Sequence, residues 1–131
     1  SGFTRATKYG LLDFKKHVKN ANKSIFVSLL IESIEGINNA KEIANIYGVD
    51  NLYFGTYDIA SSMGDENQKG ENIKNIIKKA IDNVGNNVSF GQVCVDNNQY
   101  KSLDSRINMI VFGVDCGIIL NGATRAKNGF I

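Results

Sequence analysis

Apolar residues alternate along the chain between two kinds of segment. Short, nearly continuous apolar runs predict strands at residues 25–31, 52–58, 88–95 and 107–112. The segments between them carry apolar residues at helical spacing. One helix is expected from an N-cap at Ser33 to Gly48, and a polar loop is expected from Asp65 to Glu71. The clearest of these helices is predicted by five residues at i, i+3, i+4, i+7 and i+8, namely Ile73, Ile76, Ile77, Ala80 and Ile81. The pattern therefore predicts four strands, each followed by a helix.

Strand and helix spacing indicates the class of fold. The units recur at about 20–30 residues, which is typical of parallel βα units in an α/β protein. Two architectures fit this pattern: part of a (β/α)₈ barrel, or a small open doubly wound sheet. A complete barrel takes about 250 residues. The residues alone leave both architectures open.

Composition limits the size and the partners of this molecule. The 131 residues predict one domain spanning residues 1–131, and 43% apolar with 21% charged residues is typical of a globular protein. A net charge of +2 with scattered Lys and Arg argues against a nucleic-acid partner. No run of about 20 apolar residues is present, so no membrane partner is expected.

Cysteine and histidine usage argues against a zinc site. Cys94 and Cys116 are far apart in apolar contexts, without a CxxC motif, and His17 is the single histidine. We predict two buried free thiols and a cytoplasmic location. His17 is predicted to be a surface residue on a short amphipathic helix that starts near Leu11.

Two strand ends carry carboxylates. The first predicted strand runs into Glu32, and the second turns at Gly55 and ends on Asp58. Neighbouring parallel strands lie about 4.8 Å apart, so both side chains are expected at one edge of the sheet. Two carboxylates brought together repel unless a cation or a proton lies between them. The alternative is that both are helix-start residues, Glu32 favoured by the helix dipole and Asp58 as an N-cap.

Several segments resemble the HpcH/HpaI aldolase and citrate lyase beta-subunit superfamily. Residues 31–36 (Ile-Glu-Ser-Ile-Glu-Gly) resemble its IET-x-E-G segment, and residues 49–64 resemble VDGLFIGPxDLSxSLG. Residues 4–10 are similar to TRAxxYG, and residues 112–120 to VGSDxGLL. The match is collinear over nearly the whole chain. It implies parallel βα units resembling the C-terminal half of a TIM (β/α)₈ barrel.

The resemblance implies a metal-dependent carbon–carbon lyase that acts on a small carboxylate, either a pyruvate-like 2-keto acid or a related acyl substrate. By position, Glu32 and Asp58 match the carboxylates that hold a divalent cation, Mg²⁺ or Mn²⁺. Gly55, Thr56 and Tyr57 match the segment whose backbone amides receive the substrate carboxylate. Near the N-terminus, Arg5 is a candidate anion-binding residue.

The chain also departs from the family pattern. Leu30 stands where the aldolase branch often has Gln, and Thr56 stands where the family has Pro. The first four βα units, which carry the family's catalytic His and substrate Arg, have no counterpart, and His17 does not align with that His. The catalytic residues therefore remain unassigned.

A half-barrel would expose strand edges and an apolar inner face, which favours association. We expect a homo-oligomer or a pairing with a complementary N-terminal half, unless the chain is a fragment of a longer protein. The alternative function is a non-catalytic half-barrel or flavodoxin-like domain, serving binding or assembly, with a vestigial metal site.

Overall fold

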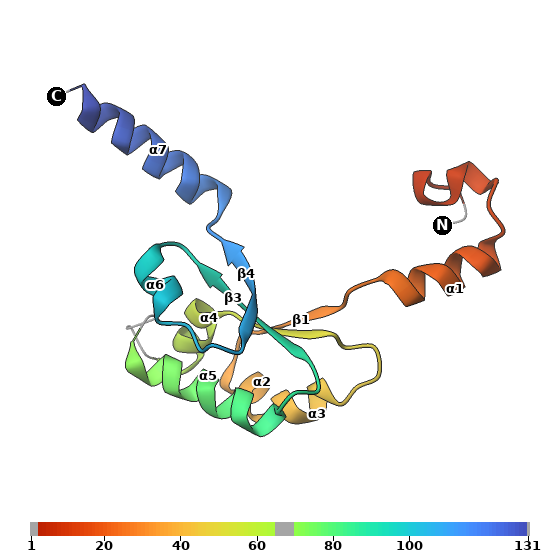
Figure 1. The fold of residues 1–131 in the computed structure, drawn as a ribbon, viewed down its shortest axis with the longest axis horizontal. Helices are drawn as coiled ribbons and strands as arrows, with labels where there is room; N and C mark the ends of the chain where they lie inside the picture. The colour runs from red at the N-terminus through yellow and green to blue at the C-terminus, as the bar shows by residue number, and fades with distance from the viewer. Residues whose placement is uncertain (1–2, 65–69, 131) are drawn as a thin grey trace.

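The computed structural model describes residues 3–64 and 70–130 (Figure 1). Its four strands form one parallel sheet in the order β1-β2-β3-β4. The strands are β1 (Ser28–Ile31), β2 (Asn51–Phe54), β3 (Ser89–Cys94) and β4 (Ile107–Phe112). Sequential order with parallel pairing confirms the predicted βα units.

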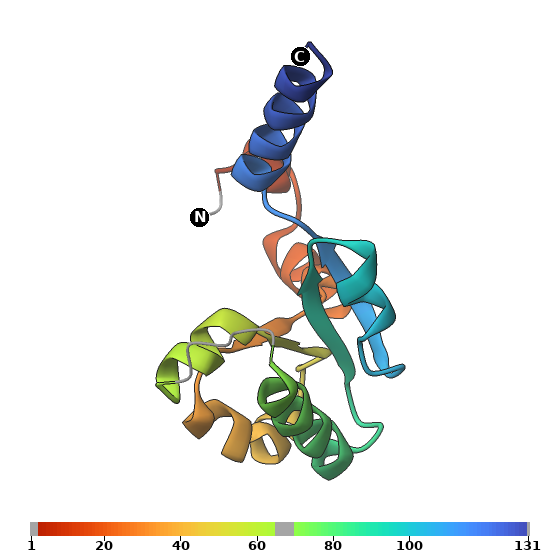
Figure 2. The same cartoon turned by 90° about the vertical axis from the view of Figure 1, so that its left-hand side faces the viewer.

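Helices connect the strands, and α2, α3 and α5 lie together beneath one face of the sheet (Figure 2). The helices are η1 (Arg5–Gly10), α1 (Phe14–Ser24), α2 (Ile34–Asn38), α3 (Ala40–Ala44), α4 (Thr56–Ser62), α5 (Glu71–Val84), α6 (Asn97–Lys101) and α7 (Asp115–Gly129). The apolar stripe predicted at residues 73–81 belongs to α5, which ends at Gly85 with φ of +74°.

A row of polar side chains fixes the register at the start of the sheet. Ser28, Asn51 and Ser89 are aligned across β1, β2 and β3. The Ser28 hydroxyl donates to Asn51 Oδ1 at 2.7 Å, and Asn51 Nδ2 donates to Ser89 Oγ at 2.9 Å. Asn51 is fully buried, so a one-residue slip would leave its amide without these partners.

The hydrophobic core lies between the sheet and the helices beneath it. Leu52 and Phe54 of β2 are fully buried there, and the Phe54 ring stacks on Phe90 of β3 with centroids 6.2 Å apart. On the α5 side, Ile73 and Ile81 are 1% and 0% exposed. These contacts confirm that the α5 stripe is core.

The opposite face of the sheet and both terminal segments are less covered. Leu30 of β1 is 53% exposed on that face. The η1–α1 arm and α7 extend away from the sheet in different directions (Figure 1). The helix expected from Leu11 begins at Phe14, because Asp13 caps it there, and Leu11 lies in the turn before it. Its apolar residues Phe14 and Val18 are 56% and 38% exposed, and Leu11 is 86% exposed. The core draws on β1 to β4 and the helices between them, and a single domain over residues 1–131 stays a prediction.

Several details differ from the sequence expectations. β2 ends at Phe54, so Asp58 lies within α4 and not at a strand end, because the chain turns at Gly55 and begins a helix there. The helix expected between Ser33 and Gly48 is interrupted at Asn39. Residues 65–69 of the expected polar loop lie outside the described residues, and α5 already begins at Glu71.

The two cysteines also differ in exposure. Both are free, as expected, and Cys94 is buried in β3. Cys116, however, is exposed in the first turn of α7, because that helix extends away from the core. Among the described residues, no helix has the length and the apolar character needed to cross a membrane.

Candidate metal and carboxylate site

The carboxyl-terminal ends of β1 and β2 carry the candidate site. The two strands are parallel neighbours, and Ile31 pairs with Phe54 at their last positions. Glu32 follows Ile31 directly, whereas Asp58 is the third residue of α4, which starts just after β2. The fold therefore brings both carboxylates to the same edge of the sheet, although from a strand end and a helix start.

Gly55 gives the Glu32 side chain its place. The Gly55 amide donates to the Ile31 carbonyl oxygen at 2.9 Å, which ties the turn to the end of β1. A Cβ added at Gly55 would lie 3.1 Å from Glu32 Cγ and 3.6 Å from Glu32 Oε1. The Glu32 side chain thus occupies space beside Gly55 that a side chain at residue 55 would otherwise fill.

The start of α4 presents backbone amides at the same edge. Gly55 is its N-cap residue and offers no side-chain cap, so the first-turn N–H groups have no side-chain acceptor. Tyr57 and Asp58 in this turn are exposed. The N–H groups and the helix dipole favour a negatively charged group, such as a carboxylate, at this position.

Two serines hold the turn that carries Glu32. The Ser33 hydroxyl accepts from the Gly36 amide at 3.1 Å and so caps α2, as the sequence predicts. The Ser62 hydroxyl of α4 accepts from the Ile34 amide at 3.2 Å and donates to the Ile59 carbonyl oxygen at 2.7 Å. The second contact connects the start of α2 to α4, and hence the Glu32 turn to the element that carries Asp58.

The cap geometry bears on the alternative interpretation of the carboxylates. Ser33 is the N-cap of α2, and Glu35 is the acidic residue of its first turn, so Glu32 precedes the helix and serves neither role. Asp58 lies inside the first turn of α4, where an acidic side chain also complements the helix dipole. Asp58 is therefore not the N-cap that the alternative expected, since Gly55 holds that position. The helix dipole accounts for Asp58 but not for Glu32.

Not all of the predicted site residues come together in this chain. Thr56 is 4% exposed, and its side chain faces a cavity between α5 and α6, so only its backbone is available to the carboxylate edge. Arg5 lies in η1, at the far end of the arm that extends from the amino-terminal side of β1 (Figure 1). Its assignment to anion binding stays a prediction, because this chain alone does not bring it to Glu32.

The donor set fits a hard divalent cation. Neither Glu32 nor Asp58 forms an ion pair within the described part of the chain, so both carboxylates are available. No group of three or more His, Cys, Asp or Glu side chains there could enclose a metal ion. Mg²⁺ is commonly held by one or two carboxylates together with water and substrate oxygens. A sheet edge with two carboxylates can bind Mg²⁺ in this way.

Sequence reasoning missed two features near this edge. The bridging role of Ser62 depends on a contact 28 residues away along the chain, which no local pattern reveals. The cavity that Thr56 faces also has Gln92 of β3 in its wall. A signal for it existed, since Gln92 is a polar residue within the otherwise apolar run Phe90 to Val95.

Comparison with known proteins gives one consistent result. The model of the HpcH/HpaI aldolase/citrate lyase family matches residues 5–121. A hydroxypyruvate/pyruvate aldolase of Sagittula stellata is 34% identical over 64 residues, which are 49% of this chain and 24% of that protein. A 5-keto-4-deoxy-D-glucarate aldolase of Escherichia coli O6:H1 is 26% identical, over 96% of this chain and 50% of that protein.

Solved structures share the fold. An HpcH/HpaI aldolase/citrate lyase family protein from Burkholderia cenocepacia superposes with a TM-score of 0.81 at 23% identity, covering 99% of this chain and 51% of that one. An HpcH/HpaI aldolase from Desulfitobacterium hafniense gives a TM-score of 0.72 at 17% identity, covering 91% and 48%. The chain thus spans 24% and 50% of the length of the two aldolases named above.

Proposed function

Because the chain belongs to the HpcH/HpaI aldolase/citrate lyase family, we propose that it provides the metal- and carboxylate-binding edge of a carbon–carbon lyase. The substrate we propose is a pyruvate-like 2-keto acid. One observation carries the proposal: Glu32 lies over Gly55, beside the uncapped first turn of α4 that also contains Asp58. The names of the aldolases that the chain resembles support a keto-acid substrate.

Each group at this edge has a proposed role. Glu32 and Asp58 hold Mg²⁺ or Mn²⁺ through hard carboxylate oxygens. The chemistry that such a cation supplies when bound is Lewis acidity toward a 2-keto group. The N–H groups at Tyr57 and Asp58 receive the substrate carboxylate, because the helix start favours an anion. Tyr57 belongs to the same turn, and its side chain is 39% exposed. No group of this chain is assigned as the general base.

The proposal includes a partner. Leu30 at 53% exposure and Val111 at 40% exposure leave apolar surface on the sheet face opposite the helices. We propose that this face is covered by a second copy of the chain or by a complementary N-terminal half. Such a partner would also supply the residues that this edge lacks. A cytoplasmic location agrees with the two free thiols.

The experiment is a thermal-unfolding titration of the chain with Mn²⁺, with and without pyruvate. A ligand at about ten times its Kd stabilises the folded state by about 1.4 kcal/mol. We expect Mn²⁺ to raise the Tm and pyruvate to raise it further. Glu32→Ala and Asp58→Ala should each remove the response, and EDTA should reverse it. Glu35→Ala is the matched control, because this neighbouring exposed glutamate lies inside α2 and should leave the response unchanged.

Two results would contradict the proposal. A response that survives in both alanine variants would place the cation elsewhere. The absence of any response in wild type would favour the alternative function, a binding or assembly domain in which the two carboxylates are relics. The two interpretations are therefore separated by the wild-type titration before any activity is measured.

A further inference from the structure

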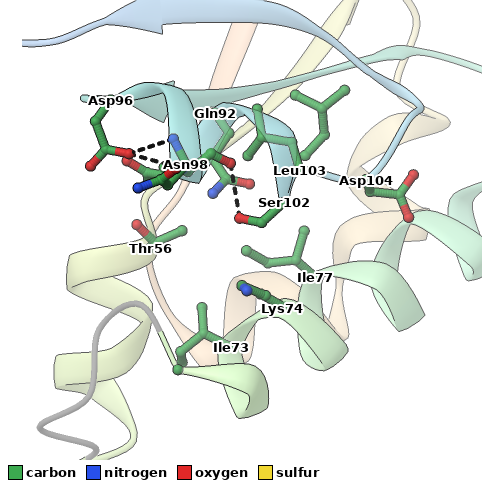
Figure 3. Close-up of a pocket in the computed structure, with 13 residues that line it drawn as sticks. Thr56, Ile73, Lys74, Ile77, Gln92, Asp96, Asn98, Ser102, Leu103 and Asp104 are labelled. Carbon is green, nitrogen blue, oxygen red and sulfur yellow. Dashed lines mark hydrogen bonds between the residues drawn. The ribbon is translucent and has the colours of Figure 1, made fainter.

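A second candidate site lies between the sheet and the helices that cover it. A cavity of about 330 Å³ opens between α5, β3 and α6 (Figure 3). Its volume is within the range of small-molecule sites, about 300–1,000 Å³. It is distinct from the Glu32 edge, because neither Glu32 nor Asp58 is part of its wall. An inference about this cavity does not rest on the proposed lyase function.

The buried hydroxyl of Thr56 in the cavity wall has no partner among the residues that the structure describes. Thr56 is 4% exposed, and its Oγ1 atom is buried without a hydrogen bond to any described residue. Figure 3 shows the side chain at the cavity, below Asp96 and Asn98. Buried hydroxyls in folded proteins nearly always have a partner, from the protein, from water or from a ligand. This hydroxyl can both donate and accept a hydrogen bond.

Gln92 brings a second unused polar group to the cavity. It belongs to β3, is 8% exposed, and lies on the same side of the strand as the buried residues Phe90 and Cys94. Its amide forms no hydrogen bond within the described part of the chain. A glutamine amide has two donor hydrogens and two acceptor lone pairs that a ligand in the cavity can use. Thr56 and Gln92 therefore both present unused hydrogen-bonding groups to the same cavity.

Two charged residues of the wall, Lys74 and Asp104, already have oppositely charged partners. Lys74 Nζ lies 3.6 Å from Glu71 Oε2. The Asp104 carboxylate accepts from Arg106 Nε at 2.8 Å and from Arg106 Nη2 at 2.7 Å, and these hydrogen bonds lower the pKa of Asp104 to about 2. Lys74 and Asp104 thus offer no uncompensated charge to an ionic ligand.

Asp96 is also engaged, although only in part. Its Oδ1 accepts from the Asn98 amide at 2.9 Å and from the Gln99 amide at 2.8 Å, which caps α6. Neither of these bonds uses Oδ2, so one carboxylate oxygen is left for a donor hydrogen. A carboxylate in this place accepts from ligand hydroxyls and repels an anion.

The rest of the wall is apolar on one side. Ile73 and Ile77 of α5 line the cavity on the side away from Gln92 and Asp96, and Leu103 after α6 lies near Gln92 and Ser102 (Figure 3). A ligand that suits this wall has a C–H face for the isoleucines and several hydroxyls for Thr56 and Gln92. We propose that the cavity is a binding site for a small neutral polyhydroxy molecule, a monosaccharide or polyol.

The test is a titration of the ¹⁵N-labelled chain with D-glucose, myo-inositol and glycerol, followed by two-dimensional NMR. We expect at least one of these probes to shift the side-chain amide signals of Gln92 in a saturable way. D-Glucuronate, which differs from glucose by one carboxylate, should bind more weakly. Thr56→Val and Gln92→Leu should each weaken binding by about five- to tenfold, the effect of one lost hydrogen bond.

Controls separate binding from folding. Thr56→Val keeps the shape and removes an unpartnered hydroxyl, so its Tm should equal or exceed that of wild type. Thr124→Val on α7, whose hydroxyl bonds the Leu120 carbonyl oxygen away from the cavity, should leave probe binding unchanged. Glu32→Ala should leave it unchanged as well. The proposal is overturned if none of the neutral probes binds, if glucuronate binds as tightly as glucose, or if both cavity variants bind like wild type.

Discussion

At the scale of the residue, Gly55 decides where Glu32 can lie. Its φ of −83° and ψ of 85° need no glycine for backbone reasons. What the position requires is space, because a Cβ there would come 3.1 Å from Glu32 Cγ. Glycine is therefore needed at residue 55 to leave room for Glu32, and not for the backbone conformation of the turn.

Gly55→Ala tests this role. The Glu32 side chain must move by a few tenths of an ångström, which forces it off its preferred rotamer at about 0.5–1.5 kcal/mol. We expect Mn²⁺ affinity to fall by about two- to tenfold, measured by calorimetric titration. The Tm should change little, because alanine restricts the unfolded chain by about 0.4–1 kcal/mol and so offsets much of this cost.

The control for Gly55→Ala is Gly122→Ala in α7. A Cβ at Gly122 meets nothing within 4 Å, so this variant should bind Mn²⁺ like wild type. Unchanged affinity in Gly55→Ala would show that Glu32 does not hold the cation in the observed conformation.

At the scale of the element, α4 connects the two halves of the candidate site. It starts at the end of β2, carries Asp58 in its first turn, and at its last residue, Ser62, accepts a hydrogen bond from the Ile34 amide at the start of α2. The helix is seven residues long, so this single bond and its buried residues Ile59 and Ala60 fix it in place.

Ser62→Ala removes that bond and leaves the Ile34 amide to solvent. We expect a loss of about 1 kcal/mol in the free energy of unfolding and faster amide hydrogen exchange at Ile34. Ser61→Ala, next to it and also exposed, has no such contact in the structure and serves as the matched control. Equal exchange at Ile34 in both variants would contradict the bridging role of Ser62.

At the scale of the whole molecule, the helices of the described residues cover one face of the sheet. The core forms between the strands and α2, α3 and α5. The other face leaves Leu30 half exposed, and α1 and α7 extend into solvent with apolar side chains uncovered, including Phe14 and Ile119. Uncovered apolar surface of this kind indicates an interface.

We expect the 14.4 kDa chain to sediment as a species larger than a monomer. Leu30→Asp should shift it toward the monomer by placing a charge on the uncovered sheet face, with little effect on the core. Leu11→Asp places the same charge on the exposed η1–α1 arm. Whichever of the two variants becomes monomeric identifies the surface that associates. A well-folded monomer at micromolar concentration would contradict the proposed self-association.

The sequence determined the local structure wherever a single element carries the information. Apolar spacing predicted α5 and the four strands, because a buried face repeats with the period of its own element. It also predicted the Ser33 cap, since that contact spans three residues. The carboxylate pair was visible because Glu32 and Asp58 follow apolar runs in neighbouring units.

Only the tertiary structure decided what depends on contacts between elements. Whether Asp58 ends a strand or begins a helix depended on the turn at Gly55 packing against the end of β1. The Ser62 bridge and the Thr56–Gln92 cavity join residues 28 and 36 positions apart. The uncovered stripe of α1 shows the same limit. The sequence determines that a helix has an apolar face, but the arrangement of the other elements determines whether anything covers it.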